Sequence, residues 1–177
     1  MQSASRLPLL WKYGLPGAFV SAINPQGESV SLVRSELEVR VMVPPCGAMP
    51  AIVDTGAGWC VFPLKRWESF SKEIEWLEPL DGSADRLVNH QGIGDSVEAR
   101  IGRVRIRLAG TDRGTNVTVC TQSFSVVGRF LLKHTQLQKI VLGLGGGALD
   151  QWSGIEYNAA TDPPTAWLVD GSQRLLS

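Results

Sequence analysis

The pattern of apolar and polar positions is most regular in the first half of the chain. From Leu37 to Val43 apolar residues alternate with polar ones, the period-two pattern of a half-buried strand. Pro44-Pro45-Cys46-Gly47 interrupts the alternation, and the apolar run Ala51-Ile52-Val53 follows it. These segments predict a hairpin whose second strand leads directly into Asp54.

A second alternation runs from Arg103 to Leu108. It places three arginines on one face of a predicted strand and Val104, Ile106 and Leu108 on the other. We interpret the arginine face as a solvated strand face. The alternative is a patch that binds an anion or a nucleic acid.

Other segments predict further strands and two short helices. Spacing close to helical from Pro63 to Leu77 indicates a helix or helical turn, and a second short helix is expected from Ala148 to Trp152. Gly14, Pro16, Pro25 and Gly27 interrupt the first thirty or so residues, which we therefore expect to be an irregular arm. Strands are expected over residues 87–88, 97–108, 116–121, 124–127, 139–143 and 166–169. The fold class is therefore mostly β, with one or two short helices.

Composition supports one folded domain and gives no sign of a charged partner. The chain has 177 residues, 44% of them hydrophobic, and 17 basic residues balance 17 acidic ones. We therefore expect no nucleic acid and no membrane as partners.

The three cysteines have no CxxC spacing and so indicate neither a disulfide framework nor a zinc site. His90 and His134 have no cysteine or carboxylate cluster near them in the sequence at the spacing of metal ligands. We expect a cytoplasmic protein with no metal and no cofactor.

The candidate chemistry lies in Asp54-Thr55-Gly56-Ala57. A carboxylate at the end of a strand, followed by a small hydroxyl residue and a glycine, can be closely approached by a second backbone. Two such loops facing each other would bring two carboxylates together, and like charges at that distance share one proton. One carboxylate then acts as a base on water while the other donates a proton to a substrate carbonyl, as in an aspartic protease.

The segment from Ala51 to Ala57 resembles the catalytic segment of the retropepsin-like aspartic proteases, the class that includes the retroviral proteases. Gln91 to Val97 resembles the glycine-rich flap tip of that family, which closes over the bound peptide. Ile140-Val141-Leu142-Gly143, followed by Ala148-Leu149-Asp150, resembles the segment that packs beneath the catalytic loop and leads into the single helix of the family.

This resemblance implies a single-lobe acid protease fold with closed, barrel-like strands and a flap hairpin. It assigns catalysis to Asp54, support of the active-site loop to Thr55, Gly56 and Ala57, and flap or substrate contacts to Gly92, Ile93 and Gly94. It covers residues 37–152, which we take as the protease domain. Residues 1–36 would be an N-terminal arm, and residues 153–177 a C-terminal extension that contains a candidate dimer-interface strand.

The second carboxylate of such a site is not evident within the chain. Asp170 also follows an apolar run, but Asp-Gly-Ser is the wrong order and few residues follow it, so we interpret Asp170 as a turn residue. The second aspartate would then be Asp54 of another copy, which predicts a homodimer. The predicted function is therefore aspartic endopeptidase activity on a polypeptide substrate.

Two other interpretations remain. A dimeric relative of the same fold could bind an extended peptide, or act as a scaffold, without cleaving anything. The run from Gly143 to Ala148 also reads G-x-G-x-x-A, the pattern of a dinucleotide-binding loop, which would require a βαβ unit around it.

Overall fold

A closed ring of strands forms the body of the protein. The computed structural model describes residues 5–13, 19–33, 35–78, 87–89 and 96–170. The strands are β1 (Ser5–Tyr13), β2 (Phe19–Ile23), β3 (Ser29–Val33), β4 (Ser35–Met42), β5 (Ala48–Val53), β6 (Cys60–Phe62), β7 (Glu75–Trp76), β8 (Leu87–Asn89), β9 (Ser96–Thr111), β10 (Thr118–Cys120), β11 (Phe124–Leu131), β12 (Ile140–Leu142), β13 (Gly154–Asn158) and β14 (Thr165–Asp170). The helical segments are α1 (Leu64–Trp67) and two 3-10 turns, η1 (Glu68–Glu73) and η2 (Leu149–Gln151).

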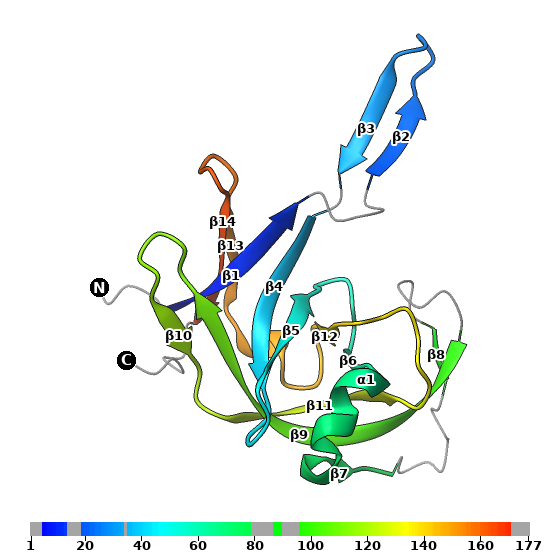
Figure 1. Ribbon diagram of the computed structural model, residues 1–177, viewed down its shortest axis with the longest axis vertical. Helices are drawn as coiled ribbons and strands as arrows, with labels where there is room; N and C mark the ends of the chain where they lie inside the picture. Colours follow the sequence, from blue (N-terminus) through cyan, green and yellow to red (C-terminus); the bar gives the residue numbers. More distant parts are fainter. Residues whose placement is uncertain (1–4, 14–18, 34, 79–86, 90–95, 171–177) are drawn as a thin grey trace.

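The ring closes because β9 has two ring neighbours along its length (Figure 1). Its middle part pairs with β11, and its C-terminal part pairs with β4, where Leu108 faces Val41. From β11 the sheet continues through β6, β12 and β5 back to β4. The β11–β6 and β12–β5 pairs are parallel, and the other pairs of the ring are antiparallel. The predicted mostly β class with closed, barrel-like strands is confirmed.

Apolar side chains from the ring strands form the core. The alternation predicted for β9 is confirmed, since Val104, Ile106 and Leu108 are buried. On the other face, Arg103 pairs with Glu75 while Arg105 and Arg107 donate to backbone carbonyls of Ser123 and Thr121. At the centre, the rings of Phe62 and Phe130 stack with centroids 4.5 Å apart. Burial of apolar surface, from these aromatic rings and from the aliphatic side chains around them, is the main term that holds the ring together.

The predicted hairpin and helices are present. β4 and β5 pair in antiparallel fashion on either side of the proline-rich turn, so β5 delivers Asp54 to a strand end. The helix expected between Pro63 and Leu77 is α1 with η1, and the one expected from Ala148 is the three-residue η2. β8 and β9 pair as the predicted flap hairpin, with Val88 facing Val97. Its tip, including Gly92, Ile93 and Gly94, lies outside the described residues.

The prediction that the first thirty residues are irregular is wrong. β1 pairs with β14 through its first half and with β4 through its second. The residues that suggested an irregular arm, Gly14, Pro16, Pro25 and Gly27, all lie outside β1, and the pairing partner β14 lies at the opposite end of the chain. β2 and β3 form a separate hairpin that extends away from the ring (Figure 1). Its turn has a recognisable signature, because Asn24 Oδ1 accepts two backbone N–H groups and Gly27 has a φ of +80°.

The C-terminal part of the chain is also built into the sheet. The strand expected at residues 166–169 is β14, which lies between β1 and β13. β13 was missed by the sequence analysis because its residues are largely exposed and show little apolar alternation. The division of the chain at residues 36 and 152 stays a prediction.

Candidate active site

Asp54 begins a tight turn at the end of β5, and its backbone and side chain are both anchored there. Its N–H donates to Leu142 O over 3.0 Å, which extends the parallel pairing of β5 with β12 by one bond. Its carbonyl oxygen accepts the N–H of Ala57, and its carboxylate Oδ1 accepts the N–H of Gly56 over 2.9 Å. The carboxylate is thus oriented by its own loop.

The residues that follow Asp54 divide between surface and core. Thr55 and Gly56 are exposed, whereas Ala57 is buried in a small apolar cluster with Val61, Val97 and Val141. A Cβ on Gly56 would lie 3.2 Å from Asp54 Oδ1, so a side chain there would press on the carboxylate. Asp54 itself is partly exposed. A fixed and accessible carboxylate is the geometry that proton transfer to or from a substrate requires.

The glycine run after β12 packs directly against the Asp54 loop. Leu144 N–H donates to Ala57 O and Gly145 N–H to Gly58 O, over 2.8 and 3.0 Å. A Cβ on Gly143 would lie 2.4 Å from Trp59 O, a distance that no real side chain tolerates. The predicted packing of Ile140–Gly143 against the loop is confirmed.

The same glycine run leads into η2, and its backbone contacts with neighbouring segments explain why position 146 is also a glycine. Leu149 and Asp150 donate their N–H groups to Gly143 O and Leu144 O. Gly146 has a φ of +83°, and a Cβ on it would lie 2.1 Å from Val127 O. β12 is followed by η2 and by β13, which pairs with β14 in antiparallel fashion. The dinucleotide-binding interpretation is therefore wrong, because that site needs a βαβ unit.

Two exposed apolar side chains flank the Asp54 loop and were missed in the sequence analysis. Trp59 is 52% exposed and Leu144 is 47% exposed. The guanidinium carbon of Arg129, on β11, lies 5.3 Å from the centre of the Trp59 ring. The signal available in the sequence was a tryptophan two residues after Ala57, where the loop re-enters the ring as β6.

Asp170 does not belong to this loop. It is buried at the end of β14, opposite Ser5, and β1 and β4 separate β14 from β5 in the sheet.

Cys60, at the start of β6, is also buried, and burial raises the pKa of its thiol to about 11. A thiol with that pKa is a poor nucleophile at neutral pH, so Cys60 acts as a core residue.

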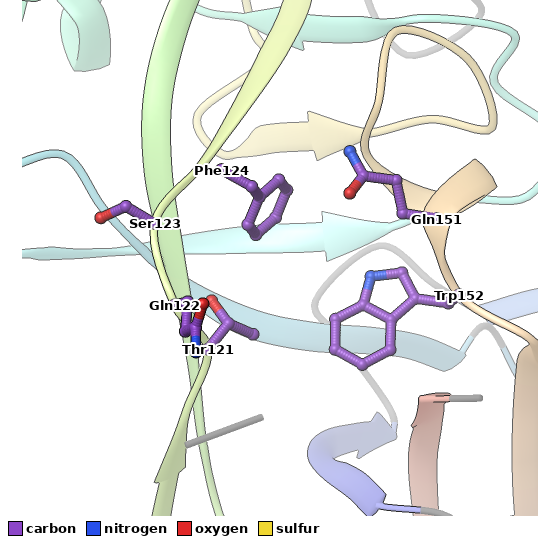
Figure 2. Close-up of a pocket in the computed structure, with 6 residues that line it drawn as sticks. All are labelled: Thr121, Gln122, Ser123, Phe124, Gln151 and Trp152. Carbon is purple, nitrogen blue, oxygen red and sulfur yellow. The ribbon is translucent and has the colours of Figure 1, made fainter. Parts of the chain in front are cut away.

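A small pocket lies between η2 and the segment that leads into β11. Its volume is about 160 Å³, and Figure 2 shows Phe124 and Trp152 at its sides with Gln151 above Trp152. Thr121, Gln122 and Ser123 complete the lining. This pocket contains no charged side chain and so offers no acid or base.

Within the described residues no group of three or more His, Cys, Asp or Glu side chains is placed to hold a metal ion. No helix in the described part of the chain is long and apolar enough to cross a membrane.

Comparison with known proteins finds similarity at the level of structure and not of sequence. No protein-family model matches the chain, and no curated protein sequence matches it. Among solved structures, the chain is similar to a retropepsin-like aspartic protease from Rickettsia conorii, with 14% sequence identity and a TM-score of 0.42. That similarity covers 92% of this chain and 95% of the other.

Proposed function

We propose that the protein is an aspartic endopeptidase whose active site is formed by Asp54 from each of two copies. The observation that carries this proposal is the geometry of the Asp54 loop. The partly exposed carboxylate of Asp54 stands at the end of a core strand and is oriented by the N–H of Gly56. The backbone N–H of Asp54 is anchored to Leu142 O. Exposed Thr55 and Gly56 leave room for a second backbone to approach it.

Two copies are required because one carboxylate cannot be both acid and base in the same step. When two Asp54 carboxylates meet across a two-fold axis, repulsion between their charges makes them share one proton. Thr55 matches the position whose hydroxyl, in the resembled family, braces the two loops against each other. The homodimer is isologous, so each copy contributes the same loop.

The reaction proceeds with water as the nucleophile. The ionised carboxylate removes a proton from water as the water oxygen bonds to the peptide carbonyl carbon, while the protonated carboxylate donates its proton to the carbonyl oxygen. The tetrahedral diol then collapses. The carboxylate that gave up its proton accepts a hydroxyl proton from the diol, while the carboxyl that took the proton from water donates it to the amide nitrogen. The C–N bond then breaks to give a carboxylic acid and an amine.

The substrate is a polypeptide bound in extended form between the two loops. Residues 92–94 match the flap that covers the peptide in the resembled family. Trp59 and Leu144, on the segments that border the Asp54 loop, expose apolar side chains, which suits contact with apolar side chains of the peptide. The mechanism needs no metal and no cofactor.

Cleavage of an unstructured protein between about pH 4 and pH 7 tests this function. We expect the wild type to cleave and Asp54→Asn, which preserves size and removes the charge, to be inactive although folded. A peptide that mimics the tetrahedral intermediate should inhibit the wild type. Retained cleavage by Asp54→Asn would remove Asp54 from the mechanism. A folded wild-type dimer that binds peptides but cleaves none would establish the peptide-binding alternative instead.

A further inference from the structure

Four charged side chains form a connected cluster on β1, on β4 and just before β12. Lys139 Nζ lies 2.9 Å from Glu36 Oε2 and 3.0 Å from Glu38 Oε2, and Lys12 Nζ lies 2.9 Å from Glu38 Oε2. We call Lys12, Glu36, Glu38 and Lys139 the four-charge cluster. Two positive and two negative charges balance within it.

The cluster spans the strand that carries Asp54. β5 lies between β4 and β12 in the sheet, as Figure 1 shows. Lys139 immediately precedes Ile140, which pairs with Ala51, and Glu38 pairs with Ile52. The contact of Lys139 with Glu38 therefore crosses β5 just before Asp54. It ties together the two strands on either side of β5.

The position of β12 matters for Asp54 because Leu142 O accepts the Asp54 N–H. Lys139 stands three residues before Leu142 on the same segment. A shift of β12 along β5 would lengthen that hydrogen bond and also move Gly143 and Leu144, which pack on the loop at Trp59 and Ala57. The cluster is thus placed to hold the register on which the orientation of the carboxylate depends.

Stability alone does not account for a cluster of this kind. Glu38 is only 4% exposed, and removing a carboxylate from water costs free energy that ion pairs offset only when their geometry is good. Well-packed apolar residues at such positions are often equally or more stabilising. Arg103 on β9 and Glu75 on β7 form an ordinary surface ion pair in the same protein, with 3.0 Å between their charged atoms and both side chains exposed.

We propose that Lys139, Glu36 and Glu38 are positioning residues for Asp54. They hold β4 and β12 in register across β5 and so fix the Asp54–Leu142 hydrogen bond. Their effect on cleavage rests on the proposed function, whereas their effect on this hydrogen bond is independent of it.

Amide hydrogen exchange at Asp54, measured by NMR, tests the proposal without relying on activity. In Lys139→Met we expect the Asp54 amide to exchange roughly tenfold faster, while amides of β9 and β11 change less than about threefold. Lys139→Arg, which keeps the cation, should restore exchange to within about threefold of the wild type. Arg103→Met removes an ion pair of similar length elsewhere and should leave the Asp54 amide unchanged.

Peptide cleavage by the same variants provides the second readout. Lys139→Met should lower kcat roughly tenfold with KM within about threefold, because the carboxylate is displaced while the substrate surface remains. Unchanged Asp54 exchange in Lys139→Met, or an equal increase at all amides, would overturn the proposal. If the wild type does not cleave, the proposed function fails and exchange still decides the role of the cluster. Should Lys139→Met not fold, Glu38→Gln tests the same contact, with the same expectations.

Discussion

The backbone N–H of Asp54 donates to the carbonyl oxygen of Leu142, so the candidate catalytic loop is anchored to a strand from a distant part of the chain. Two more backbone hydrogen bonds, from Leu144 N–H to Ala57 O and from Gly145 N–H to Gly58 O, join the Asp54 loop to the glycine run after β12. Gly143 also packs closely against the backbone of Trp59, so the two loops form one structural unit. The local geometry of the carboxylate therefore depends on residues that lie far from it in sequence.

Mixing experiments test whether two copies share the site. A constant amount of wild type is combined with increasing Asp54→Asn, and the subunits are allowed to exchange. If heterodimers are inactive, a ninefold excess of the variant lowers the activity to about one tenth, because most wild-type chains are then paired with variant chains. Activity that stays constant across the titration would show that a single chain contains the whole site.

Alanine at Gly146 should destabilise the fold. Its φ of +83° is strained for any other residue, and the added Cβ would lie 2.1 Å from Val127 O. We expect a loss of at least about 2 kcal/mol in the free energy of unfolding, measured by urea denaturation. Gly154→Ala is the matched control, because nothing lies within 4 Å of the added Cβ there. It should change stability by less than about 0.5 kcal/mol.

Truncation of Phe62 should remove a large part of the core. Phe62 is fully buried, stacks on Phe130 and meets Phe70 edge to face. Phe62→Ala should cost about 3–5 kcal/mol in denaturant unfolding, because it loses apolar contacts and leaves a cavity. Ile23→Ala, at a side chain that is 77% exposed, should cost little. Equal losses in the two variants would contradict the core described above.

Stability should depend on acid pH through Glu38. Burial alone would raise the pKa of Glu38, but hydrogen bonds to Lys12 and Lys139 and the charges of these lysines lower it below its ordinary value of 4.5. The stabilisation from this group is therefore present above pH 4.5 and is lost as the pH falls through the lowered pKa. Glu38→Gln should reduce the loss of stability below pH 4.5, as measured by unfolding midpoints across pH. An unchanged acid dependence in the variant would contradict this assignment.

Stability at alkaline pH should depend on Lys139, which loses its contribution as the pH rises and not as it falls. Burial alone would lower the pKa of Lys139, but hydrogen bonds and charge interactions with Glu36 and Glu38 raise it above 10.5. Its contribution is present below pH 10.5 and is lost as the pH rises through the raised pKa. The wild type should therefore lose stability more steeply than Lys139→Met above about pH 10.5, as measured by unfolding midpoints up to pH 12. Parallel profiles would exclude Lys139 as the group responsible.

Several local features could be predicted from residues alone. The alternation from Leu37 to Val43 and the apolar run before Asp54 predicted β4 and β5, because side-chain periodicity directly reflects which face of a strand is buried. The same physics predicted β9 from its arginines and the short helical segments from their spacing. The candidate loop was also visible, since a carboxylate, a hydroxyl and two small residues in sequence are a local chemical pattern.

Other features depended on long-range contacts that no local pattern encodes. β1 becomes a strand because β14 and β4 supply its hydrogen-bond partners, and Pro8 does not prevent this. The four-charge cluster forms because β1 pairs with β4, which brings Lys12 to Glu38, and because β4 and β12 flank β5, which brings Lys139 to Glu36 and Glu38.

Local patterns of residues were therefore enough to predict the fold class, the strand that leads into Asp54 and the chemical character of its loop. The folded chain was needed to show that the glycines after β12 pack against that loop, that Trp59 and Leu144 flank it, and that Lys139 reaches Glu38 across β5. The physical reason is that burial and alternation are properties of neighbouring residues, whereas close packing and ion pairing depend on which distant segments the closed ring brings together.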